Sequence, residues 1–248
     1  MIFHILTLFP EVFEGYRGAS ILGRAEGQGR VSMRLVNIRD FARDRHRTCD
    51  DYTYGGGAGM VLKPAPLAEA LRSIPAVRER GQEPGARVVY LTPSGRPWSQ
   101  ALAEQASRES EIVVLCGRYE GIDQRIVDAF VTDEISVGDY VLAGGEVAAM
   151  VLVDTVVRLV EGVIKAQSLA EESFRQGLLE YPQYTRPAQF EGRRVPEVLL
   201  GGDHARIERW RLVQSVAKTL RYRPELLRNR ELPPEVAAIM EELEHGQD

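Results

Sequence analysis

The sequence predicts an α/β protein in which a parallel sheet is flanked by helices. Apolar runs of strand length alternate with segments of helical periodicity along the larger, N-terminal part of the chain. Several of these runs lack the polar alternation of a half-exposed strand, which is typical of strands buried on both faces. A repeated strand and helix order of this kind favours parallel strands joined by crossover helices.

The expected elements follow one another in the sequence. The first strand, Ile2 to Leu8, leads through Phe9 and Pro10 into a helix from about Glu11 to Ala25. The later elements are expected as strand 31–36, helix 64–74, strand 88–91, helix 99–107, strand 112–115, helix 122–130, strand 134–137 and helix 146–160. The last of these helices is strongly apolar, and the width of its apolar surface predicts a contact beyond its own sheet, with a second subunit.

The segment from Arg39 to Met60 has almost no apolar periodicity. We expect a long surface loop there, and loops of this length in compact domains are usually functional or disordered. Its GGGAG run, Gly55 to Gly59, lacks the preceding strand and the following helix that a Rossmann turn requires. A nicotinamide-dependent oxidoreductase is therefore rejected, and a backbone that a large ligand approaches closely is the simpler interpretation.

Three of the expected strands end in loops that contain glycine and polar residues. These loops are Thr92 to Gly95, Gly117 to Gly121 and Gly138 to Gly145. Each one alone is typical of an ordinary turn between a strand and a helix. Because the carboxyl ends of parallel strands meet at one edge of a sheet, the three together predict a single small-molecule site.

The chain after about residue 163 predicts a second, smaller unit. We expect three parts: an α/β domain at 1–163, a flexible linker at 164–173 and a helical domain at 174–248. In the last part, His204 to Leu220 has helical spacing with Asp203 as its N-cap, and Trp210 is expected in the core. Residues 203–230 include eight Lys or Arg and three Asp or Glu. A solvated face and a nucleic-acid contact both fit this local positive charge.

Charge and cysteine content exclude several classes of protein. The net charge of the 248 residues is -5, so a nucleic-acid partner would need local basic patches. The two cysteines, Cys49 and Cys116, form no CxxC pair, and the four histidines have no HExxH spacing, so no disulfide and no metal site is expected. The chain has no apolar stretch of membrane-spanning length and no basic start typical of a signal peptide, which predicts a cytoplasmic protein.

Six blocks of residues point to a family. They are DRHRTCDDYTYGGGAGM, VVYLTPSG, LCGRYEGIDQR, ISVGDYVLAGGE, EYPQYTRP and LLGGDHARIERWR. Together they resemble the bacterial tRNA (guanine-N1)-methyltransferases, the TrmD family, from the first strand to the C-terminal helices. The resemblance implies a SPOUT-type fold with a deep trefoil knot at the cofactor site, and a homodimer with active sites at the subunit interface.

The resemblance also implies the reaction. S-adenosylmethionine would donate a methyl group to N1 of the guanine immediately 3′ of the tRNA anticodon, and a role for Mg2+ stays open. The cofactor site implied by the resemblance comprises Leu91, Thr92, Pro93, Ser94, Gly117, Tyr119, Glu120, Gly121, Ser136, Gly138, Tyr140, Leu142, Gly144 and Gly145. The substrate RNA would contact Arg43, His46, Asp50, Gly57 and Gly59, together with Arg209 and Arg211.

Methylation of guanine N1 needs a base, because the ring nitrogen is protonated and its lone pair is not free. A positive group beside O6 would stabilise the charge that develops there. In the family, an aspartate before Ser-Phe in the linker is the base, and an arginine near the end of the preceding helix stabilises the guanine. The arginine corresponds to Arg158, and the aspartate is replaced here by Glu172, with Glu171 as its neighbour.

Two alternatives to this function remain from the sequence. One is a SPOUT methyltransferase that acts on another RNA position. The other is a protein that binds S-adenosylmethionine and RNA without activity, an alternative raised by the glutamate at position 172.

Overall fold

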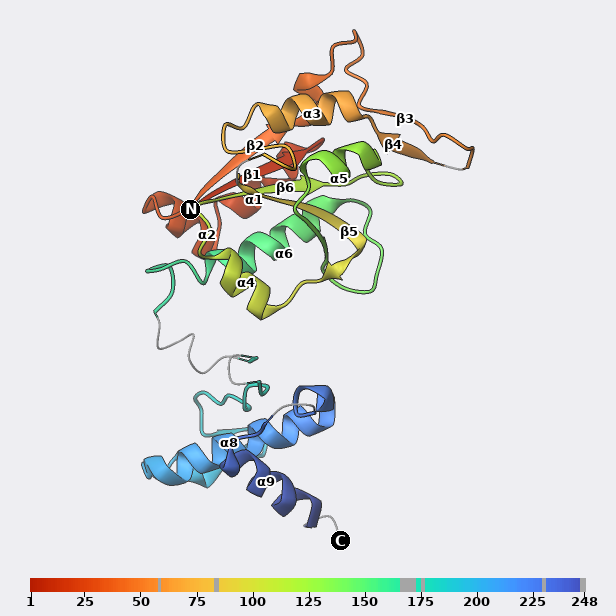
Figure 1. Ribbon diagram of the computed structural model, residues 1–248. Helices are drawn as coiled ribbons and strands as arrows, with labels where there is room; N and C mark the ends of the chain where they lie inside the picture. The colour runs from red at the N-terminus through yellow and green to blue at the C-terminus, as the bar shows by residue number, and fades with distance from the viewer. Residues whose placement is uncertain (58, 83–84, 166–172, 175–176, 229–230, 246–248) are drawn as a thin grey trace. The chain divides into compact units, whose positions relative to one another are not determined.

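The structure is a computed structural model of the whole chain, and it describes residues 1–57, 59–82, 85–165, 173–174, 177–228 and 231–245 (Figure 1). The chain divides into two compact units, Met1–Lys165 and Ala166–Asp248. In the described part of the chain, no helix is both long and apolar enough to cross a membrane.

The first unit is built on a parallel sheet of five strands. The strands are β1 (Ile2–Thr7), β2 (Ser32–Asn37), β5 (Arg87–Pro97), β6 (Glu111–Cys116) and β7 (Asp133–Ser136). Their order in the sheet is β2-β1-β6-β5-β7, and every neighbouring pair is parallel. The predicted parallel α/β class is therefore confirmed.

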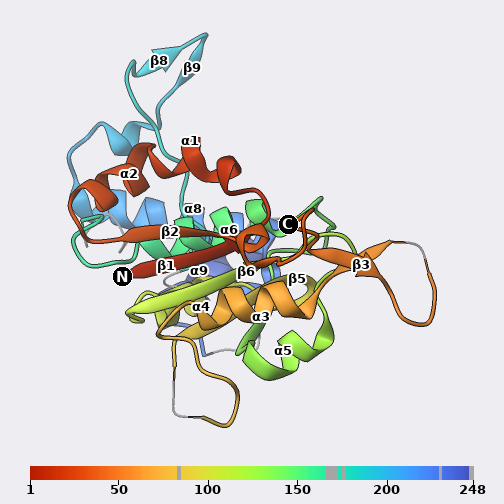
Figure 2. The same ribbon diagram turned by 90° about the horizontal axis from the view of Figure 1, so that it is seen from above.

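Helices cover both faces of this sheet, and each face has its own core. One core packs β1, β5 and β6 against α2 (Ser20–Gly27), α4 (Gln100–Ala106) and α6 (Gly145–Val157), and the other packs the same strands against α3 (Pro64–Arg72) and α5 (Gln124–Phe130). Successive residues of a strand point to opposite faces, so Ile112 and Val114 enter the first core while Val113 and Leu115 enter the second. Figures 1 and 2 show α3 on one side of the sheet and α6 on the other.

The expected helix from Glu11 to Ala25 is wrong as a continuous element. The segment contains a 3-10 turn at Pro10–Phe13, a short helix α1 (Glu14–Arg17) and then α2. The chain turns after α1, and Ser20, at the very start of α2, takes a left-handed φ of 50°. A helix cannot pass through that conformation, because a right-handed helix needs negative φ at every residue.

The expected loop from Arg39 to Met60 is also partly wrong. It contains a 3-10 turn at Ile38–Phe41 and the strand β3 (Asp50–Tyr52), which pairs antiparallel with β4 (Met60–Leu62). Cys49 and Leu62 are fully buried at the base of this hairpin. Two buried anchors therefore order a segment whose remaining residues have a loop-like composition.

Strand β5 is longer than the expected 88–91. Its pairing with β7 shifts between Leu91 and Arg96, so that both residues face Ile135 and the segment from Thr92 to Gly95 bulges out. A Cβ on Gly95 would lie 2.4 Å from the backbone nitrogen of Ile135, so only glycine fits this close approach. The bulge moves this segment away from the sheet without ending the strand.

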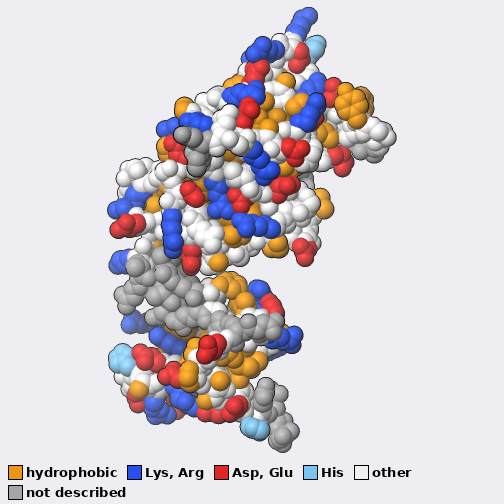
Figure 3. Space-filling model, viewed as in Figure 1, with side chains coloured by type: hydrophobic (Ala, Val, Ile, Leu, Met, Phe, Trp, Pro, Cys, Tyr) orange, Lys and Arg blue, Asp and Glu red, His pale blue; other side chains and the backbone are white. Residues whose placement is uncertain are grey.

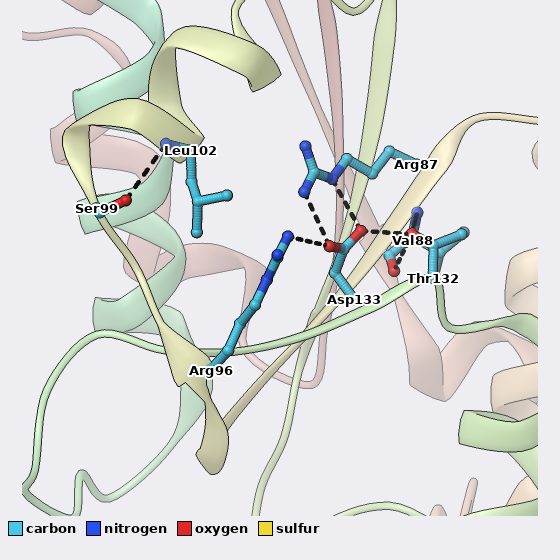
Figure 4. A network of polar contacts seen from close by, with 7 residues as sticks. All are labelled: Arg87, Val88, Arg96, Ser99, Leu102, Thr132 and Asp133. Carbon is cyan, nitrogen blue, oxygen red and sulfur yellow. Dashed lines mark hydrogen bonds and ion pairs between the residues drawn. The ribbon is translucent and has the colours of Figure 1, made fainter.

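A charged network fixes the two edges of this bulge to each other (Figure 4). Arg87 of β5 donates two hydrogen bonds to the Asp133 carboxylate, and Arg96, beyond the bulge, donates a third at 2.7 Å. The Thr132 hydroxyl donates to the other carboxylate oxygen of Asp133 at 2.9 Å. Burial alone would raise the pKa of Asp133, but the hydrogen bonds from Arg87 and Thr132 and the nearby arginine charges lower it.

The described residues of the second unit form a short hairpin and two helices, besides short 3-10 turns. The hairpin pairs β8 (Gln189–Phe190) with β9 (Arg193–Arg194), and 3-10 turns occupy Glu197–Leu199 and Pro224–Leu226. The helices are α8 (His204–Tyr222) and α9 (Pro234–His245). Asp203 caps α8 by accepting a hydrogen bond from the Arg206 backbone nitrogen at 3.2 Å, as the sequence predicts.

The core of the second unit differs from the predicted one. Its buried side chains are Leu178, Val216, Leu227, Val236 and Ile239. Trp210 is not among the residues that form this core or pack against it, and it is only half-buried. The prediction of a core tryptophan is wrong because the packed face of α8 passes through Leu212, Val213, Val216 and Leu220 and does not include Trp210.

Candidate cofactor-binding site

A cavity of about 240 Å³ opens at the carboxyl ends of β5, β6 and β7. It is lined by Tyr90, Leu91, Thr92, Pro93, Gly117, Arg118, Tyr119, Glu120, Gly121, Ile135, Ser136, Val137, Gly138, Tyr140, Val141, Leu142, Ala143, Gly144, Gly145 and Ala148. The three predicted loops therefore meet around one cavity. Every residue predicted for the cofactor lines it except Ser94, whose hydroxyl lies 2.9 Å from that of Thr92.

Two of these loops are joined directly to each other. The Gly145 backbone nitrogen donates a hydrogen bond to the Gly117 carbonyl at 2.8 Å. The Arg118 side chain donates to the Ala143 carbonyl at 3.2 Å. A Cβ on Gly144 would lie 2.2 Å from Nε of Arg118, so the arginine occupies the space that any other side chain at position 144 would need.

A buried ion pair supports this junction from below. The Arg118 guanidinium lies 2.8 Å from the Glu146 carboxylate, whose side chain is 2% exposed. The other Glu146 oxygen accepts a hydrogen bond from the Thr7 hydroxyl at 2.7 Å, and the Arg118 guanidinium stacks over the Phe9 ring at 4.5 Å. Both pocket loops are thereby connected to the end of β1.

The rim of the cavity is held in an uncommon backbone conformation. Tyr119 has a φ of 58°, in the left-handed region that non-glycine residues seldom adopt, and its side chain is 51% exposed. Strain of this kind costs about 1–3 kcal/mol and is concentrated at functional sites. Opposite it, the Tyr140 hydroxyl donates to the Val137 carbonyl at 3.1 Å and Ser136 donates to the Gly138 carbonyl. The rim is therefore shaped before a ligand arrives.

Electrostatics of the lining favour a ligand that carries positive charge. Arg118 and Glu120 are the charged side chains of this lining, and the Arg118 charge is already paired with Glu146. Glu120 is exposed and lines the cavity, so its carboxylate can interact with a positively charged ligand. The cavity floor is apolar at Leu91, Ile135 and Ala148 and can hold a flat organic ring.

Cys116 lies at the end of β6 beneath the cavity, as a buried residue rather than a lining one. Burial, followed by the neighbouring Glu146 carboxylate, raises the pKa of its thiol well above the usual value. A thiol with a raised pKa is a weak nucleophile. Cys116 therefore acts as a small buried apolar residue of the core.

The β3–β4 hairpin, where several RNA-contacting residues are predicted, borders the same cavity. Strand β4 forms two backbone hydrogen bonds with the loop after β6. The Leu62 nitrogen donates to the Gly121 carbonyl at 3.0 Å, and the Glu120 nitrogen donates to the Met60 carbonyl at 3.0 Å. Gly59 lies against Glu120, because a Cβ on Gly59 would be 2.5 Å from the glutamate Cγ. The segment predicted to contact RNA and the loop predicted to bind the cofactor are thus joined by a short ladder of backbone hydrogen bonds.

The other residues predicted to contact RNA lie at or near this hairpin. Arg43 is exposed and pairs with Glu69 at 2.8 Å, and His46 is exposed beside Asp44. Asp50 lies on β3 opposite Leu62, and Gly57, with a φ of 125°, lies in the hairpin loop. These placements bring Asp50 and Gly59 close to the cavity and leave Arg43 and His46 on the surface before β3.

The predicted catalytic pair is only partly described. Arg158 is the half-buried C-cap of α6, and its backbone nitrogen donates to the Asp154 carbonyl at 3.5 Å. Glu172 and its neighbour Glu171 lie outside the described residues. Of the two arginines predicted to hold phosphates, Arg209 pairs with Glu242 at 2.8 Å and Arg211 stacks over the Tyr181 ring at 4.8 Å.

Sequence reasoning missed several residues of the cavity. Arg118, Val141 and Ala143 lie within the predicted loops but were not among the residues predicted for the cofactor, and Tyr90, Ile135, Val137 and Ala148 line the cavity from outside those loops. Most of them lie within or beside the glycine loops, so continuity with those loops was a usable signal. The role of Arg118 as a link between two loops had no local signal, because its partners Ala143 and Glu146 are distant in sequence.

The fold and the site define a parallel α/β protein that binds a small organic molecule among loops at the carboxyl edge of its sheet. Comparison with known families is more specific. The family model described as tRNA (Guanine-1)-methyltransferase TrmD matches residues 1–229, so the chain belongs to that family.

Curated relatives agree with the family. Proteins named tRNA (guanine-N(1)-)-methyltransferase from Treponema denticola and Caldicellulosiruptor saccharolyticus are 56% and 52% identical to this chain, each over 92% of it and 90% of the relative. A protein of the same name from Geotalea uraniireducens is 51% identical over 98% of this chain and 97% of the relative. The similarity therefore extends over both units.

Proposed function

We propose that the protein transfers a methyl group from S-adenosylmethionine to N1 of the guanine immediately 3′ of the anticodon in tRNA. The observation that carries the proposal is the cavity formed by three loops of a chain whose relatives are named tRNA (guanine-N(1)-)-methyltransferase. We place the reaction in the cytoplasm, where tRNA is processed.

The lining of the cavity fits S-adenosylmethionine. The cofactor combines a flat adenine, a sulfonium and an amino-acid tail, and it supplies an activated methyl group when bound. The apolar floor at Leu91 and Ile135 would take the adenine, and backbone groups of the loop at 138–145 would meet its polar edge. The Glu120 carboxylate balances positive charge at the rim.

The protein must also remove a proton. Guanine N1 becomes a nucleophile only when its proton leaves, so a carboxylate within hydrogen-bond reach of N1 would act as general base. We assign this role to Glu172 and the stabilisation of charge on guanine O6 to Arg158. Glutamate has an intrinsic pKa close to that of aspartate, so the replacement keeps the required basicity and changes only the reach of the side chain.

The two units divide the recognition of tRNA in this proposal. The β3–β4 hairpin would hold the target guanine after it leaves the anticodon-loop stack, with Gly57 and Gly59 admitting the nucleotide. Arginines of α8, including Arg209 and Arg211, would hold phosphates and give affinity that falls with salt. On the face drawn in Figure 3, basic and acidic side chains of Met1–Lys165 are intermixed, which favours such local contacts over a broad basic field.

We further propose a homodimer and a trefoil knot at the cofactor site, as in the SPOUT fold. Support for the homodimer comes from α6, where Val147 and Val151 are 54% and 39% exposed one turn apart. A second subunit covering this apolar face would remove it from water. The described residues contain no group of three or more His, Cys, Asp or Glu able to hold a metal.

Methyl transfer to unmodified tRNA transcripts tests the proposal. We expect transfer from labelled S-adenosylmethionine to a transcript with G immediately 3′ of the anticodon, and none to the matched transcript with A there. Mass analysis of the nucleosides should find 1-methylguanosine. Label at another nucleoside would indicate a different target position, and no label with retained cofactor binding would indicate a binding protein.

A further inference from the structure

The second unit contains a cavity of its own, separate from the site described above. It has a volume of about 420 Å³ and lies between the segment before the β8–β9 hairpin and the first turns of α8. It is lined by Tyr181, Pro182, Gln183, Tyr184, Thr185, Arg186, Ala188, Val195, Leu199, Leu200, Ile207, Trp210 and Arg211. All these residues are described and belong to Ala166–Asp248.

Three aromatic rings give this cavity flat faces. The rings of Tyr184 and Trp210 lie with centroids 6.3 Å apart and planes inclined at 54°, so they form a wedge rather than a closed stack. Tyr184 is 48% exposed. Such an arrangement leaves ring surface open to a flat ligand, and it explains why Trp210 is absent from the core of the unit.

The charge of the lining favours an anionic ligand. The lining contains two arginines, Arg186 and Arg211, and no carboxylate. Arg211 is held in place by stacking of its guanidinium over the Tyr181 ring at 4.8 Å. Two more exposed arginines, Arg193 and Arg194, form the neighbouring strand β9. A nucleotide would use both features of the lining, because its base can stack on the rings and its phosphate can pair with the arginines.

The walls of the cavity are fixed independently of any ligand. The Val195 backbone nitrogen donates to the Ala188 carbonyl at 2.9 Å, which closes the hairpin wall, and Lys218 of α8 donates to the Glu180 carbonyl at 3.0 Å, which anchors the segment before Tyr181. Gln183 also donates to Glu180 at 2.7 Å. A preformed site loses little conformational freedom when a ligand enters.

We propose that this cavity binds an unstacked nucleobase of the tRNA other than the guanine that is methylated. The base stacks on the exposed ring of Tyr184, with Trp210 beside it, and Arg186 and Arg211 contact the adjoining phosphates. Stacking of splayed bases on Tyr and Trp, with arginine beside them, is the common way in which proteins hold single-stranded RNA. The inference depends on the proposed function only in taking tRNA as the substrate.

Substitution of the exposed aromatic residue tests the proposal in the full-length protein. We expect Tyr184→Ala to raise the Kd for a tRNA transcript about 5- to 150-fold, which corresponds to the loss of one stacked base, and to leave the Kd for S-adenosylmethionine unchanged. Tyr222→Ala is the matched control, because Tyr222 is also an exposed tyrosine of this unit, stacked with Arg221, and does not line the cavity. An unchanged tRNA Kd for Tyr184→Ala would show that no tRNA base stacks on this residue and would overturn the proposal.

A scan with abasic transcripts identifies the bound base. Single abasic nucleotides are placed at each unpaired position of the tRNA, and their effect on Kd is measured with the unsubstituted protein and with Tyr184→Ala. One position should weaken binding to the unsubstituted protein while having little further effect on Tyr184→Ala. Additive effects at every position, as for sites that do not interact, would contradict the inference.

Tryptophan fluorescence provides a second measurement that does not depend on Tyr184. Trp98 and Trp210 are the two tryptophans of the chain, so a Trp98→Phe protein reports on Trp210 alone. We expect the tRNA transcript to quench this emission and the abasic transcript identified above to quench it less. Equal emission with both transcripts would contradict the proposal. All three experiments measure tRNA binding, whereas the proposed function is tested by methyl transfer. A failure of one proposal can therefore be distinguished from a failure of the other.

Discussion

Arg118 and Ala143 are 25 positions apart in sequence, yet the side chain of the first holds the backbone of the second. The same guanidinium pairs with Glu146, and Glu146 is held by Thr7. Removal of one member of a buried ion pair leaves the other charge without compensation, which costs about 3–5 kcal/mol. The shape of the cavity is therefore determined by a side chain that takes no direct part in the proposed chemistry.

The proposed base gives a prediction at the level of a single residue. We expect Glu172→Gln to lower single-turnover methyl transfer to tRNA by roughly two to four orders of magnitude, because a general base contributes about that much. The Kd for S-adenosylmethionine should not change. Glu171→Gln is the control with the same chemical change one position earlier, and it should keep most of the rate. Full activity of Glu172→Gln would mean that another group accepts the proton.

At the residue scale, the sequence predicted what local composition can reveal. Glycine loops after apolar runs predicted most of the cavity lining, because three such loops at the carboxyl edge of one parallel sheet converge on a single site. Trp210 was misplaced because its spacing fits a core stripe as well as a cavity wall, and only the packing of Val213 and Val216 distinguishes the two. Arg118 had no local signal for its role, because an ion pair to Glu146 depends on the folded chain.

At the scale of an element, strand β5 could be predicted from the sequence only in part. Its apolar part was predicted, whereas its continuation through Arg96 was not, because the bulge contains Thr92, Pro93, Ser94 and Gly95, which are typical of a turn. The pairing beyond the bulge depends on β7 and on the Asp133 network, both of which are distant in sequence. The hairpin β3–β4 was missed for a similar reason, since each of its strands has three residues and β3 is mainly polar.

The Asp133 network gives a prediction for the stability of this element. Its carboxylate has a lowered pKa in the folded protein, so its ionised form contributes stability above the unfolded pKa of about 3.9, and this contribution is lost as the pH falls through the lower folded value. We expect Asp133→Asn to lower the free energy of unfolding at pH 7 by about 1.5–3 kcal/mol, the range for hydrogen bonds to a charged group.

Urea unfolding at a series of pH values measures this difference. The gap between the unsubstituted protein and Asp133→Asn should be constant near neutrality and should narrow below about pH 4 as the carboxylate takes up a proton. Asp128→Asn is the control, because Asp128 is exposed on α5 and contacts only Gln124 among the hydrogen bonds described for it. A gap that persists unchanged into acid would show that packing, not charge, explains the effect.

At the scale of the molecule, the alternation of strands and helices predicted the parallel sheet and the presence of helices on both of its faces. The order of strands in the sheet was not predicted, because periodicity describes each element separately and does not specify its neighbours. The knot and the subunit arrangement come from family resemblance and stay predictions. The second unit was expected to be helical, and its cavity was not foreseen, because the aromatic residues that line it are divided between a proline-rich segment and α8.

The proposed homodimer can be tested through α6. We expect Val151→Arg to convert a dimer of the 27.7 kDa chain into a monomer in sedimentation equilibrium, because a charge would have to be buried in the apolar contact. Val12→Arg is the control, since Val12 is 42% exposed on a 3-10 turn elsewhere in the unit. A monomeric unsubstituted protein, or a dimeric Val151→Arg protein, would contradict an interface at this face.

The ladder between β4 and the loop after β6 has a consequence for how the two substrates meet. Met60 and Leu62 of β4 share backbone hydrogen bonds with Glu120 and Gly121 of the cavity rim. A ligand that orders the cavity rim also orders β4 through these hydrogen bonds, so a second ligand that binds at β4 loses less conformational entropy. In the proposed reaction, the donor and the RNA would then assist each other's binding, and thermodynamic reciprocity requires the enhancement to be equal in both directions.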